Sequence, residues 1–140
     1  NRAYCGQKDG QQVLVIQQLV RDLNIGVEVV VVPTVREPDG LALSSRNSYL
    51  TPEQRKAAPV IYRALTQGQE LRRQGVAGGD ELRSAVRLEL EEEPLLEQIE
   101  YVSLADCETL EELDVLAGSA ILSVAVKLGQ TRLIDNLILD

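Results

Sequence analysis

The first 32 residues follow a hydrophobic pattern that changes from extended to helical and back to extended. Ala3-Tyr4-Cys5 predicts the end of a buried strand, and Asp9 to Leu23 predicts a helix that Asn24-Ile25-Gly26 ends. The apolar positions of this helix recur every three or four residues, at Val13, Ile16, Leu19, Val20 and Leu23. Val27 to Val32 is a β-branched run, typical of a parallel strand buried on both faces. The order strand, helix, strand predicts a βαβ unit with a right-handed crossover.

Helices are predicted in the middle of the chain, after a loop from Thr34 to Asn47. Thr51-Pro52-Glu53-Gln54 combines an N-cap threonine, a first-turn proline and a glutamine that completes a capping box. We therefore expect a helix from this point to about Gln74. A short glycine-rich break follows, and Asp80 is expected to cap a further helix that ends near Glu92.

The C-terminal third of the chain predicts three strands, over residues 99–105, 120–127 and 132–139. A short helix is expected from Glu108 to Leu116, between the first and second of these strands. Leu128-Gly129-Gln130-Thr131 predicts a hairpin turn between the last two. Arg132 and Asp135 are expected to form a structural cross-strand pair.

Together these elements predict an α/β chain in two parts. Residues 1–46 are expected to be a βαβ unit of an α/β domain. Residues 47–140 are expected to form a small α+β domain with a roughly three-stranded antiparallel sheet. A loop that follows a strand of a parallel sheet lies at its carboxyl edge, where α/β folds bind ligands. The loop at 34–47 is therefore the first candidate for a binding site.

Composition excludes several kinds of site. The 140 residues contain no histidine, so a Ser/His/Asp triad cannot be formed. Cys5 and Cys107 lie far apart and lack metal-binding spacing, so we expect two reduced thiols and no metal site in this chain. No run approaches the roughly 20 apolar residues of a membrane-spanning helix. The chain begins at Asn1 without a methionine, and we expect it to be a piece of a longer protein or a processed product.

The charge distribution along the chain indicates which kinds of ligand it favours. A net charge of −8 disfavours nucleic acids and anionic membrane surfaces. Residues 1–63 carry eight Lys and Arg against six Asp and Glu, whereas residues 64–140 carry six against sixteen. This asymmetry fits a polyanionic ligand on the first half, although a highly charged surface helix in the second half would produce it as well.

Two polar clusters follow the predicted strands. Gly6-Gln7-Lys8-Asp9 opens a helix, where free amides and the helix dipole favour an anion. Ser44-Ser45-Arg46 offers two hydroxyls and a planar guanidinium, which are donors suited to phosphate oxygens. Lys8 would neutralise the charge that a transition state spreads over phosphate oxygens. We predict that the two clusters converge on the triphosphate of one nucleotide.

Each of these residues also has a purely structural explanation. The lysine can be a surface residue, Asp9 a helix cap, and Gln12 an exposed glutamine rather than a ligand for a hydroxyl or carboxylate. The segment 44–46 can be a solvated linker. Glu37 and Asp39 offer carboxylates to Mg²⁺, but an aspartate in a turn is the commoner case. With no Walker loop and no G-x-G-x-x-G, spacing alone leads only to a nucleotide-site half and a small α+β domain.

Four motifs occur in one order along the chain: Tyr4-Cys5-Gly6-Gln7-Lys8-Asp9-Gly10-Gln11-Gln12, Asp39-Gly40-Leu41-Ala42-Leu43-Ser44-Ser45-Arg46-Asn47, Tyr49-Leu50-Thr51 and Arg132-Leu133-Ile134-Asp135-Asn136. Their sequence and spacing resemble the pantothenate synthetase (pantoate–β-alanine ligase) family over essentially all 140 residues. The Leu-Ser-Ser-Arg-Asn block is the most specific part of the resemblance.

This resemblance implies a ligase that uses ATP and Mg²⁺ to join pantoate to β-alanine. In that family the pantoate carboxylate attacks the α-phosphate of ATP, and pantoyl adenylate and pyrophosphate result. The amine of β-alanine then displaces AMP. The resemblance also implies that residues 1–46 are the last βαβ portion of a Rossmann-like domain of the nucleotidylyltransferase type, and that residues 47–140 are a small closing domain. It further implies a homodimer and a cytoplasmic location. The implied partners are the small-molecule substrates, without nucleic acid or membrane.

The same resemblance implies roles for individual residues. Gly6, Lys8 and Asp9 would belong to the ATP site, with Lys8 on the phosphates. Gln12 would bind pantoate, and the backbone of Val35 would meet the adenine. The segment from Leu43 to Arg46 would be a mobile phosphate loop. The catalytic set would be Lys8, Ser44, Ser45 and Arg46, of which the last three would hold the β- and γ-phosphates and stabilise the leaving pyrophosphate.

Some family features differ or are missing in this chain. Gln7 replaces the family's usual glutamate, and Gly10 stands where an aromatic residue or alanine is common, which weakens the helix start slightly. The family's histidine motif, its first pantoate glutamine and its Mg²⁺-linked acids lie in an N-terminal half that this chain lacks. We therefore expect the 140 residues alone to be inactive. Two other functions stay open: a related nucleotidylyltransferase-like ligase for another carboxylic acid, and a non-catalytic interaction module.

Overall fold

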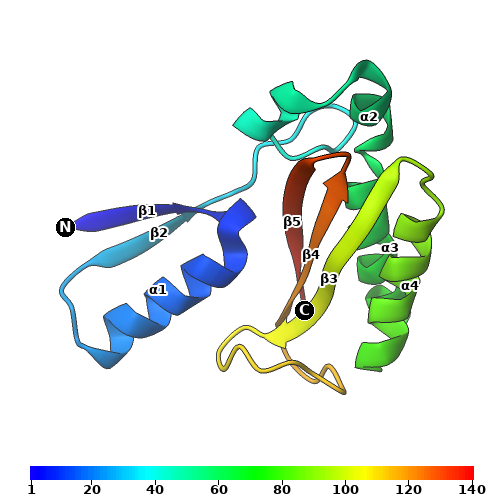
Figure 1. The fold of residues 1–140 in the computed structure, drawn as a ribbon. Helices are drawn as coiled ribbons and strands as arrows, with labels where there is room; N and C mark the ends of the chain where they lie inside the picture. The colour runs from blue at the N-terminus through cyan, green and yellow to red at the C-terminus, as the bar shows by residue number, and fades with distance from the viewer.

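The computed structural model describes all residues 1–140, and Figure 1 shows two parts joined by an extended segment. The first part contains strand β1 (Arg2–Gly6), the short 3₁₀ helix η1 (Gln7–Asp9), helix α1 (Gly10–Asp22) and strand β2 (Glu28–Val32). β1 and β2 pair in parallel, with α1 between them in the chain. The predicted βαβ unit is confirmed, and Asn24 ends its helix with a φ of 49°.

The second part is a three-stranded antiparallel sheet with two helices on one face (Figure 1). Its strand order is β3-β4-β5, with β4 in the centre. The start of α1 faces the other side of the sheet, and η1 contacts β5. The elements of this part, in chain order, are η2 (Ser45–Tyr49), α2 (Pro52–Ala57), α3 (Val60–Arg73), α4 (Gly79–Glu91), β3 (Leu96–Asp106), β4 (Ala120–Leu128) and β5 (Thr131–Leu139).

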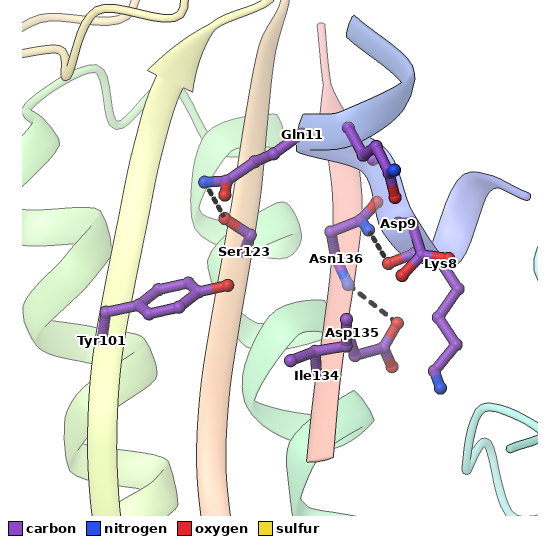
Figure 2. A pocket seen from close by; sticks show the side chains of 10 residues that line it. Lys8, Asp9, Gln11, Tyr101, Ser123, Ile134, Asp135 and Asn136 are labelled. Atoms are coloured by element: carbon purple, nitrogen blue, oxygen red, sulfur yellow. Dashed lines mark hydrogen bonds between the residues drawn. The ribbon is translucent and has the colours of Figure 1, made fainter. Parts of the chain in front are cut away.

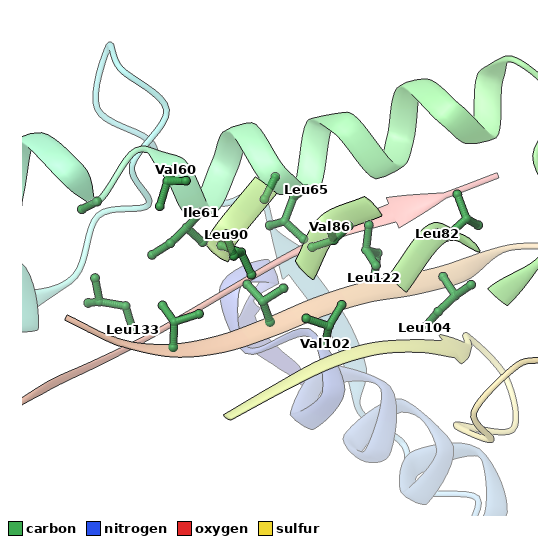
Figure 3. Packing of buried hydrophobic residues seen from close by; sticks show 14 of the residues in the cluster. Val60, Ile61, Leu65, Leu82, Val86, Leu90, Val102, Leu104, Leu122 and Leu133 are labelled. Carbon is green, nitrogen blue, oxygen red and sulfur yellow. The ribbon is translucent and has the colours of Figure 1, made fainter. Parts of the chain in front are cut away.

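The hydrophobic core lies between this sheet and the pair α3 and α4 (Figure 3). Leu65 of α3, Leu82 of α4 and Leu122 of β4 have no exposed surface. Burying a side chain of this size contributes roughly 1.5–3 kcal/mol, so the core holds the second part together. Leu41 belongs to the same cluster, although it comes from the loop before η2. That loop is therefore anchored to the second part.

The first part is much less buried. Only Gly10 and Val13 of α1 are buried, and Leu23 on the predicted apolar face is 63% exposed. β2 was expected to be buried on both faces, but none of its residues is fully buried. The reason is that these residues provide one helix and two strands, and therefore no second layer for the sheet. Among the helices of the whole chain, none combines the length and apolar composition that crossing a membrane requires.

The helix predicted over 51–74 is two helices. Thr51 and Gln54 form the predicted capping box, but α2 ends at Ala57 and Pro59 is the N-cap of α3. Proline has no backbone N–H and its ring clashes with the preceding turn, so it stands at a helix boundary. The predicted cap at Asp80 is also wrong: Gly78 is the N-cap of α4, and Asp80 pairs with Arg83 instead.

The helix predicted from Glu108 to Leu116 is absent. Asp106 Oδ1 accepts hydrogen bonds from the backbone N–H of Thr109 and of Glu108, and these bonds hold the pKa of Asp106 below its usual value. Leu110 then adopts a φ of 63°, which a right-handed helix does not permit. The segment instead forms isolated bridges, Ala105 with Glu112 and Gly78 with Val115.

Candidate functional site

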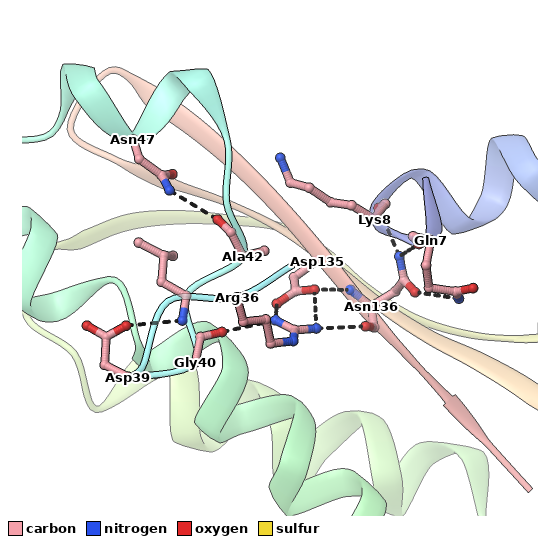
Figure 4. A network of polar contacts seen from close by, with 10 residues as sticks. Gln7, Lys8, Arg36, Asp39, Gly40, Ala42, Asn47, Asp135 and Asn136 are labelled. Carbon is pink, nitrogen blue, oxygen red and sulfur yellow. Dashed lines mark hydrogen bonds and ion pairs between the residues drawn. The ribbon is translucent and has the colours of Figure 1, made fainter. Parts of the chain in front are cut away.

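The turn that carries Lys8 is held by the last strand of the chain. Asn136 Nδ2 donates to the carbonyl oxygens of Gln7 and Lys8, both at 2.9 Å. Gln7 Nε2 donates to Asn136 Oδ1 at 3.3 Å (Figure 4). These bonds use the carbonyl oxygens of two η1 residues and fix the backbone of η1 against β5. Asp9 was weighed as a helix cap, but its side chain makes no capping bond to α1.

Gly10 lies in a position without room for a side chain. A Cβ placed there would be 2.5 Å from Ile121 Cδ1 and 3.0 Å from the side-chain amide of Asn136. The departure from the expected aromatic residue or alanine therefore has a structural reason. The missing side chain lets the first turn of α1 approach β4 and β5 closely.

The loop before η2 is a tight hairpin. Leu43 N–H donates to the carbonyl of Val35 at 2.9 Å, and Glu37 N–H donates to the carbonyl of Leu41 at 2.8 Å. Gly40, with a φ of 96°, makes the reversal. Beyond the hairpin, Ser44 caps η2 by accepting a hydrogen bond from Arg46 N–H at 3.2 Å. The hairpin and the Ser44 cap therefore fix the start of the segment that is predicted to bind phosphate.

An ion pair joins this hairpin to β5. Arg36 Nη1 and Nη2 donate to the two carboxylate oxygens of Asp135, at 2.6 and 2.9 Å. Arg36 also donates to the carbonyl of Gly40 at 3.0 Å, and its guanidinium lies 4.2 Å from the centre of the Tyr62 ring. Two parallel charge-assisted bonds and a cation–π contact make this a rigid attachment.

The structure brings Lys8 next to several of the predicted residues. A cavity of about 150 Å³ is lined by Lys8, Asp9 and Gln12 from the first part, and by Tyr101 and Ser123 from the sheet (Figure 2). A second, narrow cavity is lined by residues from both clusters, including Lys8, Ser44, Asn47 and Asp135. In Figure 4 the Lys8 side chain extends from η1 toward the loop that carries Ala42, which leads to Asn47 of η2. Gly6 lies elsewhere, in a pocket of about 260 Å³ that Asp9 and Gln12 also line.

The electrostatics of Lys8 report its surroundings. Burial is the largest effect and lowers the pKa of the Lys8 amine below 10.5. The carboxylates of Asp9 and Asp135 raise the pKa, and the charge of Arg46 lowers it further. Lys8 and Arg46 therefore lie near enough to repel each other, and an anion between them would relieve that repulsion.

Other predicted residues are more exposed than Lys8. The Val35 and Leu43 side chains are 61% and 45% exposed, and Ser45 is exposed as well. Arg46 is exposed, and its guanidinium donates only to the carbonyl of Arg132, at 3.4 Å.

The carboxylate of Asp39 makes two structural contacts within the protein. It accepts a hydrogen bond from Leu41 N–H at 3.2 Å and pairs with Arg55 at 2.6 Å. The hydrogen bond from Arg55 is the largest cause that lowers the pKa of Asp39.

Over the whole chain, no group of three or more His, Cys, Asp or Glu side chains is arranged to hold a metal ion. Both cysteines are free thiols.

Three residues at the centre of the polar network, Arg36, Asp135 and Asn136, were not predicted as site residues. The predicted cross-strand pair of Arg132 and Asp135 is wrong, because both residues lie on β5. Arg132 pairs with Glu100 of β3 at 2.6 Å, and Asp135 pairs with Arg36. The available signal was the Arg-Leu-Ile-Asp-Asn motif, which contains Asp135 and Asn136.

These features define the class of protein: an α/β chain in which residues of a Rossmann-like βαβ unit and of an antiparallel sheet together line polar cavities that contain Lys8. The sequence profile described as pantoate-beta-alanine ligase matches residues 1–138. The chain therefore belongs to the pantoate–β-alanine ligase family.

Relatives and solved structures agree with this assignment. The chain is 54% identical to the pantothenate synthetase of Roseiflexus castenholzii over 140 residues, and 58% identical to that of Chloroflexus aggregans over 139. These alignments cover 100% and 99% of this chain and 50% of each relative. The chain thus spans about half the length of the curated relatives it matches.

Among solved structures, a pantothenate synthetase from Thermus thermophilus matches with a TM-score of 0.89 and 49% identity, over 97% of this chain and 49% of that one. A Francisella tularensis pantoate-beta-alanine ligase, complexed with "Beta-gamma ATP" and β-alanine, matches with a TM-score of 0.61 and 33% identity. That match covers 99% of this chain and 43% of the other.

Proposed function

We propose that this chain works as the C-terminal half of a ligase that joins pantoate and β-alanine to give pantothenate. ATP activates the pantoate carboxylate as an adenylate, pyrophosphate leaves, and the β-alanine amine then displaces AMP. The observation that carries the proposal is the convergence of Lys8 with the Ser44-to-Arg46 segment. A related ligase has been solved with an ATP compound and β-alanine, which supports these substrates.

The proposed residue roles depend on where negative charge lies on ATP and where it develops during the reaction. Lys8, Ser44, Ser45 and Arg46 bind the phosphates and stabilise the negative charge that grows on the leaving pyrophosphate. Gly6 and Asp9, with Val35 and Leu43, complete the part of the ATP site on this chain, and Gln12 binds pantoate. The Mg²⁺ ligands are proposed to lie outside these 140 residues. Residues 1–46 are the substrate-binding part in this scheme, and residues 47–140 are the closing domain.

The structure favours a ligand site over an interaction module. A module that kept only a closing domain would need no cavity lined by both Lys8 and Ser44, whereas these residues offer an amine and a hydroxyl to a phosphate group. The choice of substrate distinguishes the proposed enzyme from a ligase for another carboxylic acid. The full-length protein should catalyse ATP–pyrophosphate exchange faster with pantoate than with other small hydroxy acids.

The test of the proposal is the Arg46→Ala variant of the full-length protein. We expect pantoate-dependent ATP–pyrophosphate exchange to fall at least about tenfold, the scale of one lost charge-assisted contact. Arg55→Ala is the matched control, since Arg55 is another partly exposed arginine that pairs only with Asp39. An exchange rate that is unchanged by Arg46→Ala would contradict the proposal and favour the interaction module.

The isolated 140 residues provide a second test. We propose that they are inactive, because part of each substrate site lies outside them. Pantoate-dependent exchange above a blank would contradict this. The homodimer and the cytoplasmic location stay predictions, to be checked by sedimentation of the full-length protein and by cell fractionation.

A further inference from the structure

Two neighbouring residues of β5, Asp135 and Asn136, contact both polar clusters. Each is 3% exposed, so each must satisfy its polar atoms within the protein. Their bonds reach back to Gln7, Lys8 and Arg36, across 99 to 129 positions of sequence. Through these long-range bonds, one short stretch of β5 determines the positions of two segments that are separate in the sequence.

The first contact sets the position of Lys8. The single amide nitrogen of Asn136 donates to two successive carbonyl oxygens, those of Gln7 and Lys8. Two bonds from one atom define both the distance of this backbone from β5 and its orientation. Gly10 makes the approach possible, because a Cβ at that position would be 3.0 Å from the same amide group.

The second contact sets the position of the phosphate segment. Asp135 holds Arg36 through two parallel bonds, and Arg36 binds the carbonyl of Gly40 at the tip of the hairpin. The hairpin leads directly to Ser44, which also lines a cavity with Lys8 and Asp135. A shift of Arg36 would therefore move the start of η2 relative to Lys8.

We infer that Asp135 and Asn136 are positioning residues that fix the separation between Lys8 and the Ser44-to-Arg46 segment. This inference rests on the proposed function, in which both segments bind one triphosphate. Adjacent residues of a strand are separated by only about 3.3 Å along it, so the two attachments form one rigid unit. Misplacement of a reacting group by about 1 Å can cost about 100-fold in rate, and the pair is expected to matter at that scale.

The experiment uses Asn136→Asp and Asp135→Asn in the full-length protein. Asn136→Asp keeps the size of the side chain but replaces the donor of both carbonyl bonds by an acceptor. Asp135→Asn keeps the shape but removes the charge that holds Arg36. We expect the kcat of ATP–pyrophosphate exchange to fall between about ten- and 100-fold, while the KM for pantoate changes less than about threefold. Glu100→Gln is the control, because it breaks another ion pair of the same sheet, and its exchange kinetics should equal those of the parent.

A double variant separates positioning from general stability. If Asn136 acts through Lys8, Asn136→Asp should add less than about twofold to the loss caused by Lys8→Ala, measured with labelled pyrophosphate over hours. A purely structural role predicts that the two losses multiply, or that exchange per folded molecule is unchanged. Either result would overturn the inference. Should a β5 variant unfold, Arg36→Lys gives the same test, since it keeps the charge and loses the second parallel bond.

The outcome also distinguishes this inference from the proposed function. If Lys8→Ala exchanges at the parent rate, the phosphate role of Lys8 is wrong, and the proposed function fails with it. If Lys8→Ala slows exchange while Asn136→Asp and Asp135→Asn do not, the proposed function stands and only the positioning role is wrong.

Discussion

Lys8 of η1 and Arg46 of η2 lie close enough for the charge of Arg46 to add to the burial that lowers the pKa of the Lys8 amine. The carboxylates of Asp9 and Asp135 oppose these effects without cancelling them, since the pKa stays below 10.5. A triphosphate bound between the two cations would reverse the balance, because its negative charge favours protonated Lys8.

This relationship predicts a pH dependence of ATP binding to the full-length protein. If ATP raises the pKa of Lys8, binding takes up a proton at pH values between the pKa of the free protein and that of the complex. Affinity should then be greatest below the lowered pKa of the free protein and should weaken as the pH rises through that pKa toward the pKa of the complex. Calorimetric titrations in buffers of different ionisation enthalpy measure both the affinity and the protons taken up.

Lys8→Arg is the control for the pH prediction. Arginine stays charged throughout this range, so the variant should still bind ATP but should lose the pH dependence assigned to Lys8. A dependence that persists unchanged in Lys8→Arg would show that another group titrates, and the prediction would be wrong.

Gly10 gives a prediction about packing. Gly10→Ala should destabilise the full-length protein, because its Cβ would lie 2.5 Å from Ile121 Cδ1, which belongs to a fully buried side chain with little freedom to move. Ile121→Val removes that carbon at a cost of about 0.5–1.5 kcal/mol. The double variant should therefore be more stable in urea unfolding than the sum of the single effects predicts. Strict additivity would mean that the two side chains do not meet.

Local patterns were enough to predict much of the fold. The period of apolar residues predicted α1, and the capping box at Thr51 predicted the start of α2, because both signals depend on neighbours within a few residues. The continuous helix over 51–74 was wrong because the pattern runs through Pro59, and the helix does not. At 108–116 the composition suited a short helix, but the bonds of Asp106 to the following N–H groups favour a turn.

The site was predictable only in part, for a different reason. Lys8 and Ser44 belong to short polar motifs next to strands, so their chemistry is visible in the sequence. The contacts of Arg36 with Asp135, and of Asn136 with Gln7, span about a hundred positions, and no local pattern specifies such partners. The sequence around an arginine in a loop does not tell whether its side chain is solvated or binds a buried carboxylate.

Cys107 provides a prediction about reactivity. Burial is the main cause that raises the pKa of its thiol above 9.0, and the negative charges of Asp106, Asp140 and Glu108 raise it further. Because the thiolate is the nucleophile, Cys107 should react with iodoacetamide more slowly than an unfolded peptide thiol near pH 8, and the rate should still be rising above pH 9.0. Alkylation of the peptide that contains Cys107 is followed by mass spectrometry after digestion. A rate equal to that of the peptide would contradict the assigned burial.

The capping box gives a prediction about the segment that follows the phosphate cluster. Gln54 N–H donates to Thr51 Oγ1 at 3.2 Å, and Thr51 N–H donates to Gln54 Oε1 at 2.9 Å, so each residue satisfies a free donor of the other. Thr51→Ala should lower the free energy of unfolding by about 1 kcal/mol, measured by urea denaturation of the full-length protein. Ser48→Ala is the matched control: it removes an exposed hydroxyl bond within η2, at 2.8 Å, and surface changes of this kind usually stay within about 0.5 kcal/mol. Equal effects of the two variants would mean that the box does not stabilise the start of α2, and that the end of η2 is fixed by the hydrophobic core instead.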